Sequence, residues 1–233
     1  MRATLSGAHG FAGTAIASCA LLAALALPAL AQDPTADIDP ATLVPSGILS
    51  QSQAGDTASD PKLAWLTDAE CEEARAKGFK VGIVMQTMNI EWSTEQVRGI
   101  TDGLARCGAT VIGVTNPDFA VDKQIGQIDD MIQLAPDAII SIPVDDVATA
   151  ATYKRVQEAG IKLVMMDNVP AGLASPADYQ TVVSSDSAGL GAVTAAILAK
   201  YLPENAEVGV ISFGITFFVT NERTRHRDRV RRR

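Results

Sequence analysis

Residues 79–115 read FKVGIVMQTMNIEWSTEQVRGITDGLARCGATVIGVT, and this stretch decides the fold. It opens with an apolar run of strand length at Phe79–Thr87. Ser93–Gln96 (STEQ) has the pattern of a capping box at a helix N-terminus, and apolar residues then recur at helical spacing as far as Gly108. A second apolar run, ATVIGVT, follows at residues 109–115. The stretch therefore predicts a strand, a helix and a second strand.

The same alternation continues along the chain. Apolar spacing and the positions of glycine and proline predict further helices over residues 121–132, 146–159 and 187–201, and further strands over 137–142, 161–167, 180–184 and 207–212. A capping box at Thr67–Glu70 predicts a short earlier helix that ends at Gly78. Continuous apolar strands that alternate with amphipathic helices indicate a parallel sheet covered on both faces. The predicted fold class is α/β, a doubly wound parallel sheet.

The N-terminus has the pattern of an export signal. Arg2 is followed by an apolar run over residues 15–27 and by the small-residue pattern Ala29-Leu30-Ala31. We therefore expect a signal peptide over residues 1–31, cleavage near Ala31, and a periplasmic location. Residues 32–62 are rich in Pro, Ser, Ala and Asp, and they predict an extended, disordered leader.

Composition narrows the function classes. The chain is 47% hydrophobic with a net charge of −8, and the basic residues concentrate at the C-terminal end, so an acidic body argues against nucleic acid as a partner. Its two histidines are His9, in the predicted signal peptide, and His226, in the basic C-terminal stretch. A Ser-His-Asp triad, a Cys-His dyad and a His-ligated metal site are therefore not expected. The sequence assigns no catalytic residue, no metal ligand and no cofactor.

Two cysteines remain after the predicted cleavage. Cys71 and Cys107 form a candidate disulfide in an oxidising compartment. The alternative is two unpaired cysteines that act as small hydrophobic residues.

Polar and aromatic residues follow the predicted strands. In an open parallel sheet, ligands bind at the carboxyl ends of the strands. The residues found there are amides, carboxylates and aromatics without Lys or Arg: Gln86, Asn89, Trp92, Asn116, Asp118, Phe119, Asp145, Asp167 and Asn168. Carboxylates and amides suit the hydroxyl groups of a neutral sugar, and an aromatic ring suits its C–H face. The first turn has no glycine, so a dinucleotide site of the Gly-rich type is not expected.

Each of these residues also has a structural interpretation. Asp and Asn after a strand are common helix caps and turn formers, and Trp92 and Phe119 could cover the apolar end of the sheet. Asp186 is interpreted as the N-cap of the following helix. Asp167 is the strongest single candidate, because a carboxylate that ends an apolar strand is costly unless something pairs with it.

Five segments together resemble the sugar-binding proteins of bacterial ABC importers, of the ribose-binding-protein type. They are VGIVMQTMNIEWSTEQVRGI, DKQIGQIDDMI…PDAIISIPVDD, AGIKLVMMDNVP, VVSSDSAGLG and FFVTNER, and the resemblance runs from about Phe79 to Arg223. The resemblance implies two Rossmann-like lobes that close over one monosaccharide and deliver it to a membrane permease, with a monomeric protein. The positions that match ligand contacts of the family are Gln86, Asn89, Trp92, Ser93, Asp145, Asp167, Asn168, Asn221 and Arg223.

The sequence also departs from the family pattern. A single aromatic residue, Trp92, stands before Ser93 where the ribose-binding pattern has two, and Asn168 stands where it has arginine, which argues against ribose itself. By this resemblance the first lobe spans residues 63–182 and is nearly complete, the second lobe begins at residues 183–223, and residues 224–233 are a basic tail of aberrant sequence. We therefore expect a truncated or frameshifted C-terminus and impaired sugar binding.

Three other function classes fit parts of the sequence. A periplasmic sugar sensor that presents its ligand to a receptor would have the same sequence features. An exported glycosidase could use Asp145 and Asp167 as acid and base. A gene regulator of the same two-lobed fold is disfavoured by the export signal and by the lack of a helix-turn-helix pattern.

Overall fold

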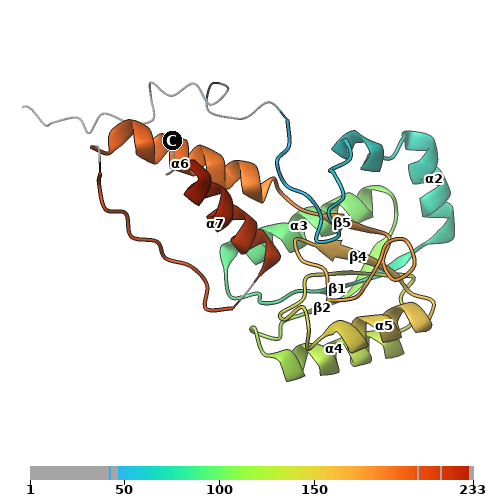
Figure 1. Cartoon of the computed structure of the whole chain (residues 1–233). Helices are drawn as coiled ribbons and strands as arrows, with labels where there is room; N and C mark the ends of the chain where they lie inside the picture. The colour runs from blue at the N-terminus through green and yellow to red at the C-terminus, as the bar shows by residue number, and fades with distance from the viewer. Residues whose placement is uncertain (1–41, 43–46, 204, 216, 231–233) are drawn as a thin grey trace, which may run out of the picture. The chain divides into compact units, whose positions relative to one another are not determined.

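In the computed structural model of the chain, residues 42, 47–203, 205–215 and 217–230 are described, and side chains are described as far as residue 225 (Figure 1). The predicted signal peptide, its cleavage position and most of the predicted leader lie outside these residues. The description below concerns the part of the chain from residue 47 onward.

Five parallel strands form one sheet. All neighbouring strands are paired in parallel, in the order β2-β1-β3-β4-β5. The strands are β1 (Lys80–Val84), β2 (Thr110–Thr115), β3 (Ala138–Ser141), β4 (Lys162–Met166) and β5 (Thr181–Val183). The strand order reverses between β1 and β3, because the chain adds β2 on one side of β1 and then continues on the other. The predicted α/β class with a parallel sheet is confirmed.

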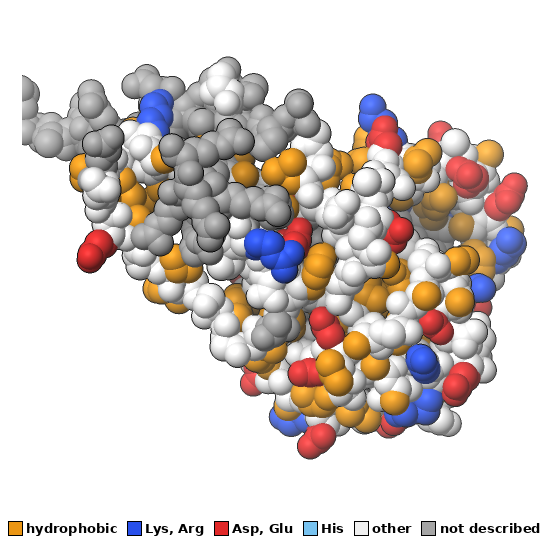
Figure 2. All heavy atoms as spheres, in the orientation of Figure 1, with side chains coloured by type: hydrophobic (Ala, Val, Ile, Leu, Met, Phe, Trp, Pro, Cys, Tyr) orange, Lys and Arg blue, Asp and Glu red, His pale blue; other side chains and the backbone are white. Residues whose placement is uncertain are grey.

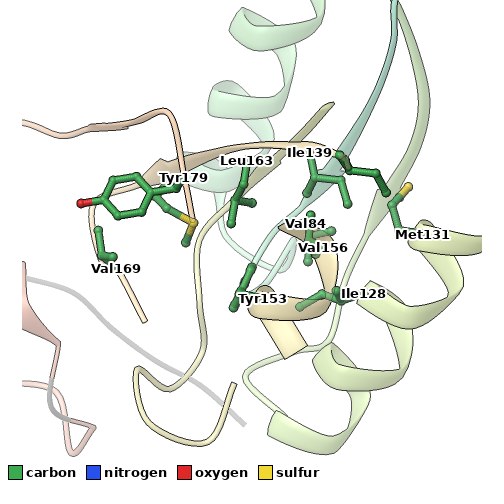
Figure 3. Close-up of a cluster of buried hydrophobic side chains, with 11 residues drawn as sticks. Val84, Ile128, Met131, Ile139, Tyr153, Val156, Leu163, Val169 and Tyr179 are labelled. Atoms are coloured by element: carbon green, nitrogen blue, oxygen red, sulfur yellow. The ribbon is translucent and has the colours of Figure 1, made fainter. Parts of the chain in front are cut away.

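Helices cover both faces of the sheet (Figure 1). On one face, α4 (Val121–Gln133) and α5 (Ala150–Glu158) pack on the strands through a buried cluster that includes Ile128, Tyr153 and Leu163, whose side chains converge in Figure 3. On the other face, α3 (Glu91–Arg106) contributes partly buried apolar side chains to a second cluster around the fully buried Ile83. These faces are those of a doubly wound sheet.

The segment before the sheet is anchored to α3. The 3-10 helix η1 (Pro61–Ala64) precedes α2 (Asp68–Lys77). The predicted capping box is present, since the Thr67 hydroxyl accepts from the Glu70 N–H and the Glu70 carboxylate accepts from the Thr67 N–H; Gly78 ends α2 at φ 63°. Cys71 is joined by a disulfide to Cys107, with their Cα atoms 4.4 Å apart. The structure therefore selects the disulfide over the two unpaired cysteines.

Two helices begin elsewhere than predicted. The capping box predicted at Ser93 is wrong, because α3 begins at Glu91 with Ile90 as its cap and no side-chain cap hydrogen bond. Ser93 lies inside the helix and is fully buried. The helix predicted from residue 146 begins only at Ala150, because Asp145 forms a turn in which its carboxylate accepts the N–H groups of residues 147 and 148.

After β5 the described chain forms two helices joined by an irregular segment. The helix α6 (Ser187–Tyr201) packs on α7 (Phe218–Val230), and Gly191 permits the contact because a Cβ there would lie 2.1 Å from the Arg223 carbonyl oxygen. The strand predicted over residues 207–212 is wrong, since 205–215 form no strand. A strand requires a paired neighbour, and no described segment pairs with this one. Large apolar side chains of this segment are exposed, including Ile211 and Phe213. Figure 2 shows hydrophobic side chains at the surface along the stretch that joins α6 to α7.

The predicted disorder of the leader needs correction from residue 47 onward. Gln51 and Thr57 form an isolated antiparallel bridge, and Ser50 makes hydrogen bonds to residues more than 130 positions away. This part of the chain has little regular secondary structure, as expected, but it has specific tertiary contacts.

Candidate functional site

The loops that follow β1 and β2 are joined by a network of polar side chains. The Asp118 carboxylate accepts from the amide of Asn89 at 2.7 Å and from the hydroxyl of Thr87 at 3.3 Å. The amide oxygen of Asn116 accepts the backbone N–H of Met88 at 2.9 Å, and its amide nitrogen donates to Asn89 at 3.3 Å. The predicted site residue Asn89 is therefore held in place from two directions, and its side chain is still exposed.

Three further predicted residues lie just beyond β1. Trp92 is on the first turn of α3 and is 42% exposed, so its indole presents an apolar face to solvent. Gln86 and Ser93 are buried, and among the described atoms neither the Gln86 Oε1 nor the Ser93 Oγ has a hydrogen-bond partner. A buried unpaired oxygen is costly, so this end of the sheet has unused hydrogen-bonding capacity.

Two acidic residues follow β3, and they have different surroundings. One carboxylate oxygen of Asp145 accepts the N–H groups of Val147 at 2.9 Å and Ala148 at 2.7 Å, which is a turn-forming role. Asp146 is half-buried, and burial, followed by the nearby charge of Asp145, raises the pKa of Asp146 to about 6. Asp145 is the one of the two that was predicted as a site residue, and its Oδ1 is already used in these backbone hydrogen bonds.

The β4 loop contains the predicted residues Asp167 and Asn168. Asp167 adopts the left-handed backbone region at φ 56°, which is uncommon outside glycine and clusters at functional sites. Its carboxylate accepts the Ser184 hydroxyl at 2.9 Å. Burial raises the pKa of Asp167, and the Ser184 hydrogen bond and the charge of Arg223 counteract that rise. Asn168 is almost fully buried, and its amide oxygen accepts the Val219 N–H at the start of α7 at 3.4 Å.

The two predicted residues on α7 have different positions. Arg223 lies close enough to Asp167 to influence its ionisation, and its guanidinium donates to the Ser187 hydroxyl at 3.2 Å. Asn221 is exposed on α7, and within the described part of the chain its side chain forms no hydrogen bond with the other predicted residues. The structure thus places Asp167, Asn168 and Arg223 near one another and leaves Asn221 apart from them.

The predicted residues therefore form two groups at the same edge. Gln86, Asn89, Trp92 and Ser93 lie just beyond β1. Asp167 and Asn168 lie just beyond β4, and Arg223 approaches Asp167 from α7. Asp145, in the β3 loop, and Asn221, on α7, belong to neither group. Since β3 lies between β1 and β4, the two groups are separated by two interstrand spacings, about 10 Å.

Gln124 was not predicted from the sequence, and its side chain forms hydrogen bonds with the backbone just beyond β1 and β3 at this edge. Gln124 is fully buried on α4, its amide nitrogen donates to the carbonyls of Met85 at 3.2 Å and Ile142 at 2.9 Å, and its amide oxygen accepts the Val144 N–H at 2.8 Å. It joins the ends of β1 and β3, where the strand order reverses. The available signal was a glutamine on the apolar stripe of a predicted helix, three residues after Val121 and four before Ile128.

A shallow pocket at the opposite edge has no relation to these groups. It is lined by residues at the amino end of β4 and by the loop before β5, including Lys162, Pro176 and Gln180. In the described part of the chain, histidine, cysteine and acidic residues form no cluster of three that could hold a metal ion. We also find, among the described residues, no helix with the length and hydrophobicity that a bilayer crossing requires.

Comparison with known proteins agrees with this geometry. A family model described as the periplasmic binding protein domain matches residues 81–230. The chain belongs to the periplasmic binding protein family. This confirms the family predicted from the sequence, and the match continues past residue 223, where the aberrant tail was predicted to begin.

Individual relatives are distant and longer. The chain is 26% identical to the ribose import binding protein of Bacillus subtilis over 132 residues, which cover 57% of this chain and 42% of that protein. Among solved structures, a Mycobacterium smegmatis protein in complex with β-D-fucofuranose has a TM-score of 0.57 at 17% identity, covering 66% of this chain and 51% of that one. An ABC sugar transporter subunit from Rhodobacter sphaeroides has a TM-score of 0.56 at 22% identity, covering 66% and 52%. The chain thus spans about half the length of the relatives that it matches.

Proposed function

We propose that this chain is the solute-binding component of an ABC importer, that it is exported to the periplasm, and that it binds a monosaccharide or a similar polyol at the carboxyl edge of its sheet. The observation that carries the proposal is the presence, at one edge, of the exposed indole of Trp92 and the partly buried carboxylate of Asp167. The family and the sugar-related names of its relatives support the same conclusion.

The two groups at this edge would have complementary roles. The face of Trp92 would cover the apolar C–H surface of a sugar ring. The carboxylate of Asp167 would accept hydrogen bonds from two adjacent hydroxyls and would be compensated in this way for its burial. Arg223 on α7 would donate to the ring oxygen or to a hydroxyl from the other side. The separation of about 10 Å between the ends of β1 and β4 is suited to one ring with its hydroxyl groups.

The two tryptophans of the chain provide a direct test. Trp65 is outside the proposed site and Trp92 is within it, so Trp65→Phe leaves one reporter at the site and Trp92→Phe leaves one away from it. We expect monosaccharides from a panel to change the emission of the Trp65→Phe protein and to leave the emission of the Trp92→Phe protein unchanged. Asp167→Asn should weaken the response at least tenfold, since the carboxylate accepts more than one hydroxyl. Because the sequence predicts impaired binding, the titration should extend to about 100 mM sugar. Equal responses from both single-tryptophan proteins, or no response to any sugar in that range, would contradict the proposal.

Two further measurements address the remaining parts of the proposal. Expression in a Gram-negative host, followed by N-terminal sequencing of the periplasmic fraction, should give a protein that begins at Gln32. Incubation with chromogenic glycosides should release no product, whereas turnover that is lost in Asp145→Asn or Asp167→Asn would favour the glycosidase alternative.

A further inference from the structure

A short segment before the sheet, Leu49–Gln53, contacts three places at the carboxyl edge. We call this segment the strap. It lies outside residues 81–230, which match the family model, and it contacts the β3 loop, the β4 loop and the junction between β5 and α6. These contacts connect positions more than 90 residues apart in the sequence.

The strap completes the N-terminus of α6. The Ser50 hydroxyl accepts the Ala188 N–H at 2.9 Å, and the Asp186 carboxylate accepts the Gly189 N–H at 2.9 Å. The same carboxylate accepts two N–H groups of the strap, those of Leu49 at 3.2 Å and Ser50 at 2.9 Å. Although burial acts to raise the pKa of Asp186, these hydrogen bonds lower it overall. The first N–H groups of a helix have no partner within the helix, so a hydroxyl and a carboxylate placed there fix where α6 starts.

The strap also joins the loops after β3 and β4. Gln53 uses both ends of its side-chain amide, because the nitrogen donates to the Asp146 carboxylate at 3.3 Å and the oxygen accepts the Val169 N–H at 2.5 Å. Val169 follows Asn168, which in turn accepts the N–H of Val219 on α7. One strap side chain therefore bridges two loops of the candidate site.

A tight turn prearranges the strap for these contacts. The Ser52 hydroxyl donates to the Asp56 carboxylate at 2.9 Å and accepts the backbone N–H groups of Ala54 and Asp56, and Gly55 takes a φ of 90°. Because these bonds are local, they lower the entropic cost of placing Ser50 and Gln53 on the sheet edge.

We propose that the carboxyl edge contains a peptide-binding site whose occupant is the strap, and that Ser50 and Gln53 are positioning residues that hold the β4 loop and the β5–α6 junction together. The junction is where the chain leaves the sheet, so holding it sets the position of α6 relative to Asp167. The test of these contacts requires no sugar.

Hydrogen exchange of the full chain measures this directly. In the double variant Ser50→Ala, Gln53→Ala, we expect peptides covering residues 167–171 and 186–191 to exchange about fivefold to tenfold faster, with β3 unchanged. Gln51→Ala is the matched control, because Gln51 is exposed and pairs with Thr57 through the backbone, which the substitution retains. Unchanged exchange at both places, or an equal increase throughout the sheet, would overturn the proposal.

Rescue in trans distinguishes a binding site from general stabilisation. In the full-length Ser50→Ala, Gln53→Ala variant, a synthetic peptide of residues 47–58 should restore slow exchange at 186–191 in a concentration-dependent way. The same peptide with Ser50→Ala and Gln53→Ala should not restore it. Failure of the unaltered peptide, or equal rescue by both peptides, would show that the edge does not recognise the strap.

Discussion

Replacing Gln124 by methionine removes three buried hydrogen bonds while keeping the length of the side chain. Gln124 is fully buried, and its amide joins the Met85 and Ile142 carbonyls and the Val144 N–H at 2.8–3.2 Å. Methionine fills nearly the same volume without polar atoms at its end, so packing is retained and the change tests the hydrogen bonds themselves.

The magnitude follows from the groups left without a partner. A buried N–H that loses its acceptor costs about 1–3 kcal/mol, and carbonyls that lose one donor cost less. Part of this free-energy cost is offset, because the methionine side chain has no polar group that must lose its hydration on folding. We therefore expect Gln124→Met to lower the free energy of unfolding by about 2–4 kcal/mol.

Urea denaturation followed by circular dichroism measures this value. With a slope of about 2 kcal/mol per molar urea, the midpoint should fall by roughly 1–2 M. The control is Gln133→Met, the same substitution at an exposed position near the end of the same helix, which should change stability by less than about 0.5 kcal/mol. A loss below about 0.5 kcal/mol in Gln124→Met would refute the idea that this amide joins the ends of β1 and β3.

Three further changes test other parts of the fold. Replacing Cys71 and Cys107 together by serine should cost about 4 kcal/mol in urea denaturation, because the cross-link spans 36 residues of the unfolded chain; no difference between oxidised wild type and variant would argue against the bond. Because burial raises the pKa of Asp146 from 3.8 to about 6, the free energy of unfolding should fall as the pH rises from 4 to 6. After allowance for the partial exposure of this residue, Asp146→Asn should stabilise the protein by about 1 kcal/mol at pH 7.5 and should have no effect at pH 4. An equal gain at both pH values would contradict the assignment. Gly82→Ala should lose about 1–3 kcal/mol in thermal unfolding, since its Cβ would lie 2.5 Å from the Met131 sulfur. The same change should cost less in a Met131→Ala background, where that sulfur is absent; an equal cost in both backgrounds would contradict the contact.

The alternating elements could be predicted because burial leaves a periodic signal in the sequence. The apolar run at β1 and the helical spacing of α4 both predict the observed elements to within a few residues. The helix cap at Thr67 could also be predicted, because Thr67 and Glu70 three residues later each accept a backbone N–H hydrogen bond from the other. These signals are local, so one sequence contains them in full.

The errors concern features that depend on distant partners. Ser93 has the sequence pattern of a cap, but the extended conformation of Ile90 sets an earlier start for α3 and buries the serine. Residues 207–212 have a strand pattern, but a strand also requires a paired neighbour, which a local pattern cannot supply. The contacts of Gln53 and the strap depend on residues more than 90 positions away, and composition alone predicts disorder there.

The two groups of the candidate site differ in how firmly they are held, and this difference bears on how a ligand would bind. At the β1 end, Asn89 is fixed by Asp118 and Asn116, and Gln124 supports the strand ends from below. At the β4 end, Asp167 has one hydroxyl partner and a charge interaction with Arg223, which comes from a separate helix. A sugar placed between Asp167 and Arg223 would replace their charge interaction with direct hydrogen bonds to its hydroxyls. At the β1 end it would bind side chains that are already held by other hydrogen bonds. Movement of α7 would alter two long hydrogen bonds, Val219 N–H to Asn168 at 3.4 Å and Arg223 to Ser187 at 3.2 Å. Closure of α7 toward the β1 edge would therefore disturb weaker contacts than movement of the β1 loop, where Asn89 donates to Asp118 at 2.7 Å.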